Sequence, residues 1–277
     1  MVFNKNINGL AVQVNTNIYL RLTDEFNAGK LRAVICSGQA AVLHRIAIMS
    51  KDGDWILREN KETCRHVLSV LQNHGAHYRF GAPLDIRWLA RGWSSHFEFD
   101  SGGMRIRTDF FTRPPRIAND ELPALWNDQA GKNPPFVDMA TLARLKQTDR
   151  EKDYAIIGEL AQQMENNADQ LRFSRSALDL MRLAKQHPAL VRKLVKERPL
   201  LAVISGGSRE NIETALDAER RVMIHRNENR LAEFESAAGR WRKHWPELAR
   251  IISGLPLLKA HAVLVKDALK YLPGTAA

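Results

Sequence analysis

Two short segments, Ser37-Gly-Gln-Ala-Ala-Val-Leu-His44 and Ser50-Lys-Asp-Gly-Asp-Trp55, decide the fold that this sequence predicts. The apolar run from Leu31 to Cys36 precedes them, so the predicted order is strand, glycine-containing turn, short helix and second strand. Asp52 and Asp54 open the second strand, and residues i and i+2 of an extended chain point to the same face. The two carboxylates therefore project together, which suits a divalent cation bound to phosphate oxygens.

Residues 31 to 58 resemble the signature of the nucleotidyltransferase superfamily, in which a small glycine turn and a helix precede an Asp-x-Asp pair on the next strand. The resemblance extends over roughly residues 15 to 155. The family pattern includes a third acidic residue on a neighbouring strand. Asp109, in the strand-like run Arg105-Ile-Arg-Thr-Asp-Phe-Phe111, is its best match.

The resemblance implies transfer of a nucleoside monophosphate from an NTP to an acceptor hydroxyl, with release of pyrophosphate. Under this hypothesis Asp52, Asp54 and Asp109 are the catalytic residues and bind Mg²⁺ or Mn²⁺ in a two-metal arrangement. Ser37 and Gly38 are expected to bind the nucleotide phosphates through backbone N–H groups at the start of the helix.

A further part of the resemblance lies near residue 150. In the family, an apolar helix that ends in lysine and is followed by an Arg-x-x-Asp-like stretch commonly closes the catalytic domain, and Lys146, Arg150 and Asp153 match this arrangement. Lys146 and Arg150 are therefore candidate nucleotide-binding residues. Their alternative role is that of ordinary surface charges.

Two positions depart from the family pattern. The turn reads Ser37-Gly38-Gln39 in place of a glycine pair, and Gly53 replaces the usual apolar residue between the aspartates. An open alternative is therefore a catalytically degenerate protein that binds nucleotide without turning it over, with its helical half as a module for a partner protein.

The periodicity of the chain predicts a mixed-sheet α/β (α+β) fold, with a nucleotidyltransferase-like domain at residues 15 to 150 and a helical domain at residues 151 to 277. Residues 93 to 112 read as a hairpin that turns at Ser101-Gly-Gly103. Five or more helices and no second sheet are expected after residue 150, and the two parts are expected to pack around a cleft. Residues 1 to 15 are expected to form a short strand or a frayed end. The helical pattern covers 154–166, 174–186, 188–197, 209–237 and 258–271.

Composition and charge narrow the class of protein. With 277 residues, 44% of them apolar, the chain can form one large or two ordinary domains, and its apolar runs are far shorter than a membrane span. The cytoplasm is the expected location. Cys36 and Cys64 have no disulfide or zinc spacing and are predicted to be buried. The net charge of +10 is compatible with a nucleotide or a polyanion such as RNA.

The sequence leaves the acceptor open: a small-molecule amino alcohol, an RNA end such as that of tRNA, or a protein side chain. Basic segments such as Arg192-Lys-Leu-Val-Lys196 and Arg240-Trp-Arg-Lys-His-Trp245 favour a polyanion slightly. An acceptor of this kind would bind less tightly as the salt concentration rises.

Other enzyme classes have weaker signals or none. The chain has neither a Gly-x-Ser-x-Gly elbow nor a Walker motif, and its histidines follow no familiar metal-ligand spacing. The pairs Arg182/His187 and Arg220/His225 formally resemble the Arg-x4-6-His motif of small helical toxin RNases. This keeps a toxin-type RNase in the helical half as a less favoured alternative.

Overall fold

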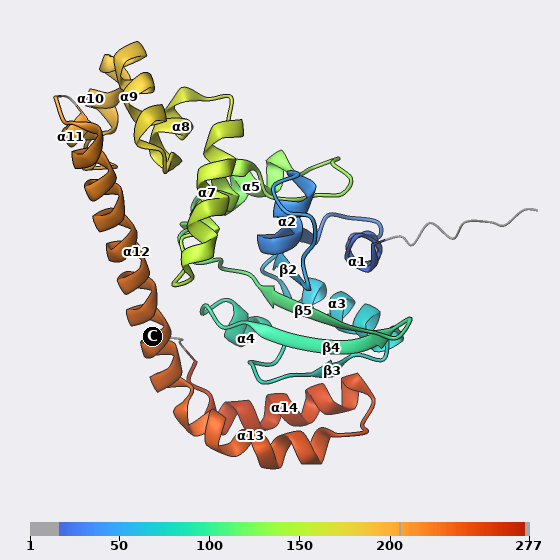
Figure 1. Ribbon diagram of the computed structural model, residues 1–277. Coiled ribbons are helices and arrows are strands. Elements are labelled where there is room, and N and C mark those ends of the chain that lie inside the picture. The colour runs from blue at the N-terminus through green and yellow to red at the C-terminus, as the bar shows by residue number, and fades with distance from the viewer. Residues whose placement is uncertain (1–16, 205, 275–277) are drawn as a thin grey trace, which may run out of the picture.

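The computed structural model describes residues 17 to 204 and 206 to 274 (Figure 1). The expectation for residues 1 to 15 lies outside this part of the chain. The strands are β1 (Ala33–Cys36), β2 (Asp52–Leu57), β3 (His77–Tyr78), β4 (Ser95–Ser101) and β5 (Met104–Phe111). The helices are α1 (Ile18–Phe26), α2 (Ser37–Leu43), α3 (Lys61–Asn73), α4 (Ile86–Leu89), α5 (Leu122–Asp128), α6 (Met139–Leu145), α7 (Glu151–Gln163), α8 (Asn167–Phe173), α9 (Ala177–Gln186), α10 (Pro188–Leu194), α11 (Leu201–Ile204), α12 (Arg209–Ala237), α13 (Gly239–Ile252) and α14 (Leu257–Tyr271).

The five strands form one mixed sheet in the order β1-β2-β5-β4-β3. β1 and β2 are antiparallel, β2 and β5 are parallel, and β5, β4 and β3 continue as antiparallel neighbours. The α/β fold predicted from the sequence is therefore confirmed. The β4–β5 hairpin turns at Gly102 and Gly103, whose positive φ angles of 57° and 76° favour glycine.

The two faces of the sheet differ because side chains alternate along each strand. On one face, Trp55 and Phe110 stack with ring centroids 5.3 Å apart, and Phe26 of α1 meets each ring edge-on. The Trp55 indole N–H also donates to Thr23 Oγ1 at 2.9 Å. This face is the core, so the side chains of Asp52, Asp54 and Asp109 project from the opposite, polar face.

All the described residues after α7 are helical or lie in connections between helices, as predicted. Their buried side chains fall into two groups. Leu171 to Leu216 hold a separate small core, whereas α13 and α14 add Trp241, Leu248 and Leu264 to the main core around the sheet. The long helix α12 connects the two groups, and α14 packs on α3 and β3 (Figure 1). The predicted boundary at residue 150 stays a prediction.

The elements that were not predicted include β3, α8, α11 and α13. β3 has only two residues, which is too short for a recognisable alternation. The predicted helical ranges leave out residues 239 to 252, which include Pro246, but α13 runs through this proline because Trp241, Leu248 and Ile252 are buried on one side. Tertiary packing therefore outweighs the local cost of proline here.

None of the helices in the described residues is both long and apolar enough to cross a membrane.

The core leaves no room for a side chain at Gly53. A Cβ atom there would lie 2.5 Å from the Tyr19 ring and would also overlap the Trp55 ring. We expect Gly53→Ala to lower the free energy of unfolding by about 1–3 kcal/mol, because one of the two rings must shift. Gly239→Ala is the matched control, since nothing lies within 4 Å of its added Cβ. Urea denaturation that shows equal stability for the two variants would contradict this account of Gly53.

Candidate functional site

The parallel pairing of β2 with β5 brings two of the predicted carboxylates together. Asp54 lies directly opposite Asp109, and Asp52 lies opposite Arg107. Paired residues on neighbouring strands project from the same face, so three acidic side chains and one arginine share a small area of the polar face. The sequence predicted this convergence of Asp54 with Asp109.

Asp54 has the most perturbed carboxyl of the site. Protein atoms surround its carboxyl on most sides, and the residue is only partly exposed. This loss of hydration, followed by the negative charge of Asp109, raises the pKa of Asp54 from its ordinary value of 3.8 to about 7. The positive charge of Lys146 and a hydrogen bond from Ser37 oppose the shift. Three candidate residues from separate parts of the chain, Ser37, Asp109 and Lys146, therefore act on one carboxyl.

Asp52 carries an oxygen that the fold does not satisfy. Its Oδ1 atom is buried without a hydrogen-bond partner in the part of the chain that the structure describes. Its backbone carbonyl, in contrast, accepts from Ser50 Oγ at 3.0 Å and from Gln39 Nε2 at 3.4 Å. Gln39, at a position that departs from the family pattern, therefore links α2 to the start of β2 through a buried side chain.

Ser37 and Gly38 form the tight entry from β1 into α2. Ser37 has a φ of 56°, a conformation that is uncommon for residues other than glycine and that is found often at functional sites. Gly38 has a packing role, because a Cβ atom on it would collide with Ser50 Oγ. α2 has only seven residues. A phosphate site here would therefore depend on the turn and on the hydrogen bond of Ser37 to Asp54.

Lys146 and Arg150 meet at one buried carboxylate. Lys146 is 6% exposed and Asp153 is 1% exposed, and their Nζ and Oδ1 atoms lie 3.3 Å apart. Arg150 and Thr148 both donate to Asp153 Oδ2, at 3.0 and 2.6 Å. Lys146 is close enough to Asp54 to affect its pKa, whereas the contacts of Arg150 are with Asp153. The structure thus brings Lys146, rather than Arg150, to the carboxylates.

Asp109 has two partners that sequence reasoning missed. Oδ1 of Asp109 lies 2.8 Å from Nδ1 of His96 and 3.4 Å from NH1 of Arg79. The signal for His96 was present in the sequence, because a hairpin that turns at Gly102 and Gly103 sets residue 96 opposite residue 109. Arg79 follows β3, a strand that the sequence did not reveal.

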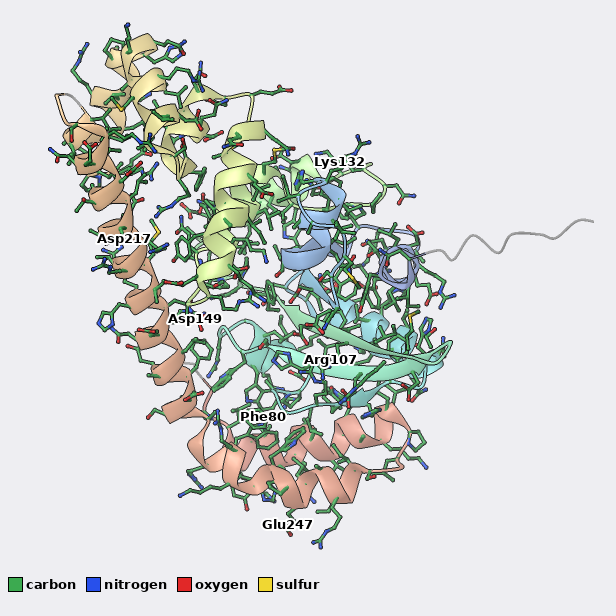
Figure 2. All side chains as sticks on the ribbon, viewed as in Figure 1. Phe80, Arg107, Lys132, Asp149, Asp217 and Glu247 are labelled. Carbon is green, nitrogen blue, oxygen red and sulfur yellow. The ribbon has the colours of Figure 1, made fainter. Side chains whose placement is uncertain are left out.

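A groove of about 790 Å³ begins at Asp52. It runs between α1, the segment before β2 and the tip of the β4–β5 hairpin. Four basic side chains line it, those of Arg21, Lys51, Arg105 and Arg107, and Figure 2 shows Arg107 over the sheet. A groove with this charge, next to a carboxylate pair, suits a polyphosphate chain.

The donor set fits a cation that Asp52 and Asp54 hold together with ligand phosphate. Mg²⁺ commonly uses only one or two protein carboxylates, and Oδ1 of Asp52 is an oxygen without a hydrogen-bond partner among the described residues. Across residues 17–204 and 206–274, no group of three or more His, Cys, Asp or Glu side chains is placed to hold a metal ion. Asp109, whose Oδ1 contacts His96 and Arg79, is thus outside any preformed three-carboxylate cluster.

The residues of the RNase alternative do not form a shared site. Arg220 and His225 both lie on α12, and five residues of helix turn through about 500°, which puts their side chains about 140° apart. Arg220 contacts Asp217, three residues before it. His187 lies between α9 and α10, outside the helix that carries Arg182.

Comparisons with known proteins add little to this geometry. No protein-family model matches the chain, and no curated protein matches it. Among solved structures, the chain is similar to one described as "Crystal structure of putative nucleotidyltransferase from H. pylori". The two are 13% identical with a TM-score of 0.38, and the match covers 76% of this chain and 94% of that chain. A similarity this distant carries no argument, so the site has to be judged on its own residues.

The raised pKa of Asp54 predicts a pH-dependent cost of folding. An unfolded chain loses this proton near pH 3.8, whereas the folded chain keeps it up to about pH 7, so stability falls as the pH rises between these values. We expect Asp54→Asn to raise the free energy of unfolding at pH 8 by on the order of 2 kcal/mol, about half of what the full shift would give. At pH 4 the two proteins should be equally stable.

Asp24→Asn serves as the control, because Asp24 is an exposed carboxylate on α1. Its effect should stay within about 0.5 kcal/mol at both pH values. Urea denaturation at pH 4 and pH 8 measures all three proteins. An Asp54→Asn protein that is less stable than wild type at pH 8 would show that the fold depends on the charge.

Proposed function

We propose that this protein is a metal-dependent nucleotidyltransferase that moves a nucleoside monophosphate from an NTP to an acceptor hydroxyl. The observation that carries the proposal is the cluster on the polar face: Asp54 opposite Asp109, with the unpartnered oxygen of Asp52 beside them. Such a group is costly to assemble without a ligand, because it brings like charges together away from water. A bound cation would offset that cost.

Asp52 and Asp54 are the proposed ligands of Mg²⁺ or Mn²⁺. When bound, such an ion neutralises phosphate charge and polarises a phosphoryl oxygen. The basic side chains of the groove, among them Arg21 and Arg107, are placed to hold the outer phosphates. Ser37 and Gly38 lie at the inner end of the site, beside Asp54, where they would contact the nucleotide phosphates.

Asp109 and Lys146 complete the proposed site. Asp109 is the candidate acceptor of the proton from the incoming hydroxyl, and its contacts with His96 and Arg79 fix its orientation. Lys146 is fixed by Asp153, so its ammonium group is a preorganised positive charge near Asp54. Arg150 is assigned to orienting Asp153 and Thr148, with any phosphate contact made by its exposed end.

Incubation of the protein with labelled NTP and Mg²⁺ or Mn²⁺ tests the proposal. Wild-type protein is expected to release pyrophosphate, with an RNA pool and amino alcohols supplied as acceptors. Asp52→Asn and Asp54→Asn are each expected to lower the rate by about 100-fold or more, because one fewer negative ligand weakens the ion and misplaces the phosphate. Asp24→Asn is the control for an uninvolved carboxylate and should keep the wild-type rate.

Nucleotide binding, measured by calorimetry with Mg²⁺, separates the alternatives. A binding-only protein would take up nucleotide in an Asp52-dependent way and release no pyrophosphate. An RNase would cleave RNA in both aspartate variants but not in His225→Ala. Failure of the wild-type protein to bind any of the four NTPs with Mg²⁺ would overturn the proposal.

A further inference from the structure

A second pocket, of about 250 Å³, lies where the segment between β3 and β4 meets α12 and α13. Its walls are mostly apolar and largely aromatic, and Figure 2 shows Phe80 between the sheet and the C-terminal helices. The polar or charged side chains of Ser94, His96, Glu235 and Arg242 also line it. The apolar lining consists mainly of Phe80, Trp93, Leu231, Phe234, Trp241 and Leu272.

Two of the residues that line this pocket, Ser94 and His96, form a hydrogen-bonded row with Asp109, which lies behind the lining. Ser94 Oγ lies 2.9 Å from Nε2 of His96, and Nδ1 of His96 lies 2.8 Å from Oδ1 of Asp109. The backbone accounts for this arrangement. Ser94 and His96 are two residues apart in an extended segment and so share a face, and His96 is directly opposite Asp109 in the hairpin.

The partners of His96 decide which nitrogen carries its proton. An ionised carboxylate only accepts hydrogen bonds, so Nδ1 beside Asp109 is the donor. With the proton assigned to Nδ1, Nε2 is the acceptor and the Ser94 hydroxyl donates to it. A serine whose proton already points at a base that a carboxylate orients has the arrangement of an activated nucleophile.

Neighbouring residues hold the histidine ring in place. Gly81 makes room for it, because a Cβ atom on Gly81 would lie 2.5 Å from Cδ2 of His96. The carbonyl of Gly81 accepts from the Trp241 indole N–H at 3.0 Å, which ties this segment to α13. Arg79 contacts the same oxygen of Asp109 as His96 does, so the carboxylate is also held from a second side.

We propose that Ser94, His96 and Asp109 form a second active site, one that hydrolyses carboxylic esters with a ring-sized apolar acyl group. Ser94 Oγ attacks the carbonyl carbon, His96 Nε2 takes the hydroxyl proton, and the tetrahedral intermediate collapses as His96 gives that proton to the departing alcohol. Water, deprotonated by His96, then cleaves the acyl-serine and releases the acid and free Ser94. The acyl group occupies the apolar pocket.

This second site does not rest on the proposed nucleotidyltransferase function. Its chemistry uses neither nucleotide nor cation, and its nucleophile lies outside the groove at Asp52. Ester hydrolysis in EDTA therefore tests Ser94 alone, whereas loss of nucleotide binding in Asp52→Asn tests the other site alone.

The experiment treats the full chain with a fluorophosphonate probe in EDTA and locates the adduct by peptide mass spectrometry. We expect one phosphonyl group per chain, on Ser94, and hydrolysis of p-nitrophenyl benzoate that disappears when Ser94 is labelled. Ser94→Ala should remove both. His96→Gln should slow both by about 100-fold or more, since general-base catalysis is lost.

Two matched controls separate this site from adventitious reactivity. Ser69 is an exposed serine on α3, and His77 is a histidine 3.2 Å from a carboxylate, Glu98, without a serine at its other nitrogen. Ser69→Ala and His77→Gln should leave labelling and hydrolysis unchanged. Gly81→Ala should slow labelling by displacing the His96 ring. Melting curves confirm that each variant is folded.

Absence of an adduct on Ser94 in folded wild-type protein would overturn the proposal. Labelling of Ser94 at the rate seen for Ser69, or at a rate that His96→Gln does not change, would overturn it as well. Hydrolysis of the benzoate ester that persists fully in Ser94→Ala would assign the activity to another residue.

Discussion

The parallel pairing of β2 with β5 is the constraint on which the polar face depends. It sets Asp54 against Asp109, so two carboxylates of like charge share the middle of a sheet. Nothing local in either strand requires this pairing. The aromatic cluster on the other face enforces it, because Trp55 of β2 and Phe110 of β5 stack in the core and fix the register of both strands.

Because side chains alternate along β2, neighbouring residues of this strand face the hydrophobic core and the polar face in turn. Gly53 lies between Asp52 and Asp54, under the rings of Tyr19 and Trp55, so the core is closely packed beneath the carboxylates. On the polar face, burial of the Asp54 carboxyl and the negative charge of Asp109 raise the pKa of Asp54. Stabilisation of the hydrophobic face thus sustains a destabilising charge cluster on the polar face, a conflict between stability and activity that is common at functional sites.

Helices outside the sheet place a positive charge beside the carboxylates of the polar face. α6 and α7 deliver Lys146 with Asp153 as its buried partner. Arg116 then donates to the carbonyls of Arg144 and Leu145 at the end of α6, and to Asn227 on α12. Burial lowers the pKa of Arg116 to about 10, so the guanidinium remains charged at neutral pH. A single side chain therefore links the lysine-bearing helix to the long helix α12.

The sequence predicted the elements whose patterns are long or whose turns are distinctive. The alternation of apolar and polar residues predicted the β4–β5 hairpin. The helical spacing of apolar residues predicted α12 with its observed limits, Arg209 to Ala237. The pairing of Asp54 with Asp109 followed from the resemblance. No pattern in the sequence indicated β3, because a two-residue strand is defined only by its pairing with a partner strand. Nor did any pattern indicate that α13 would continue through Pro246. The contact between His96 and Asp109 was not predicted for a different reason. A sequence motif names the residues it contains, but not the residues that strand register places opposite them.

The position of His96 also explains how one carboxylate can belong to two sites. Both partners of Asp109, His96 and Arg79, use Oδ1. A carboxylate offers about four lone-pair positions on two oxygens, so Oδ2 keeps its own capacity to accept a proton or a hydrogen bond. Asp109 can therefore orient His96 on the side of the apolar pocket while it raises the pKa of Asp54 on the other side. Strand register alone, which places Asp109 between Asp54 and His96, gives it both neighbours.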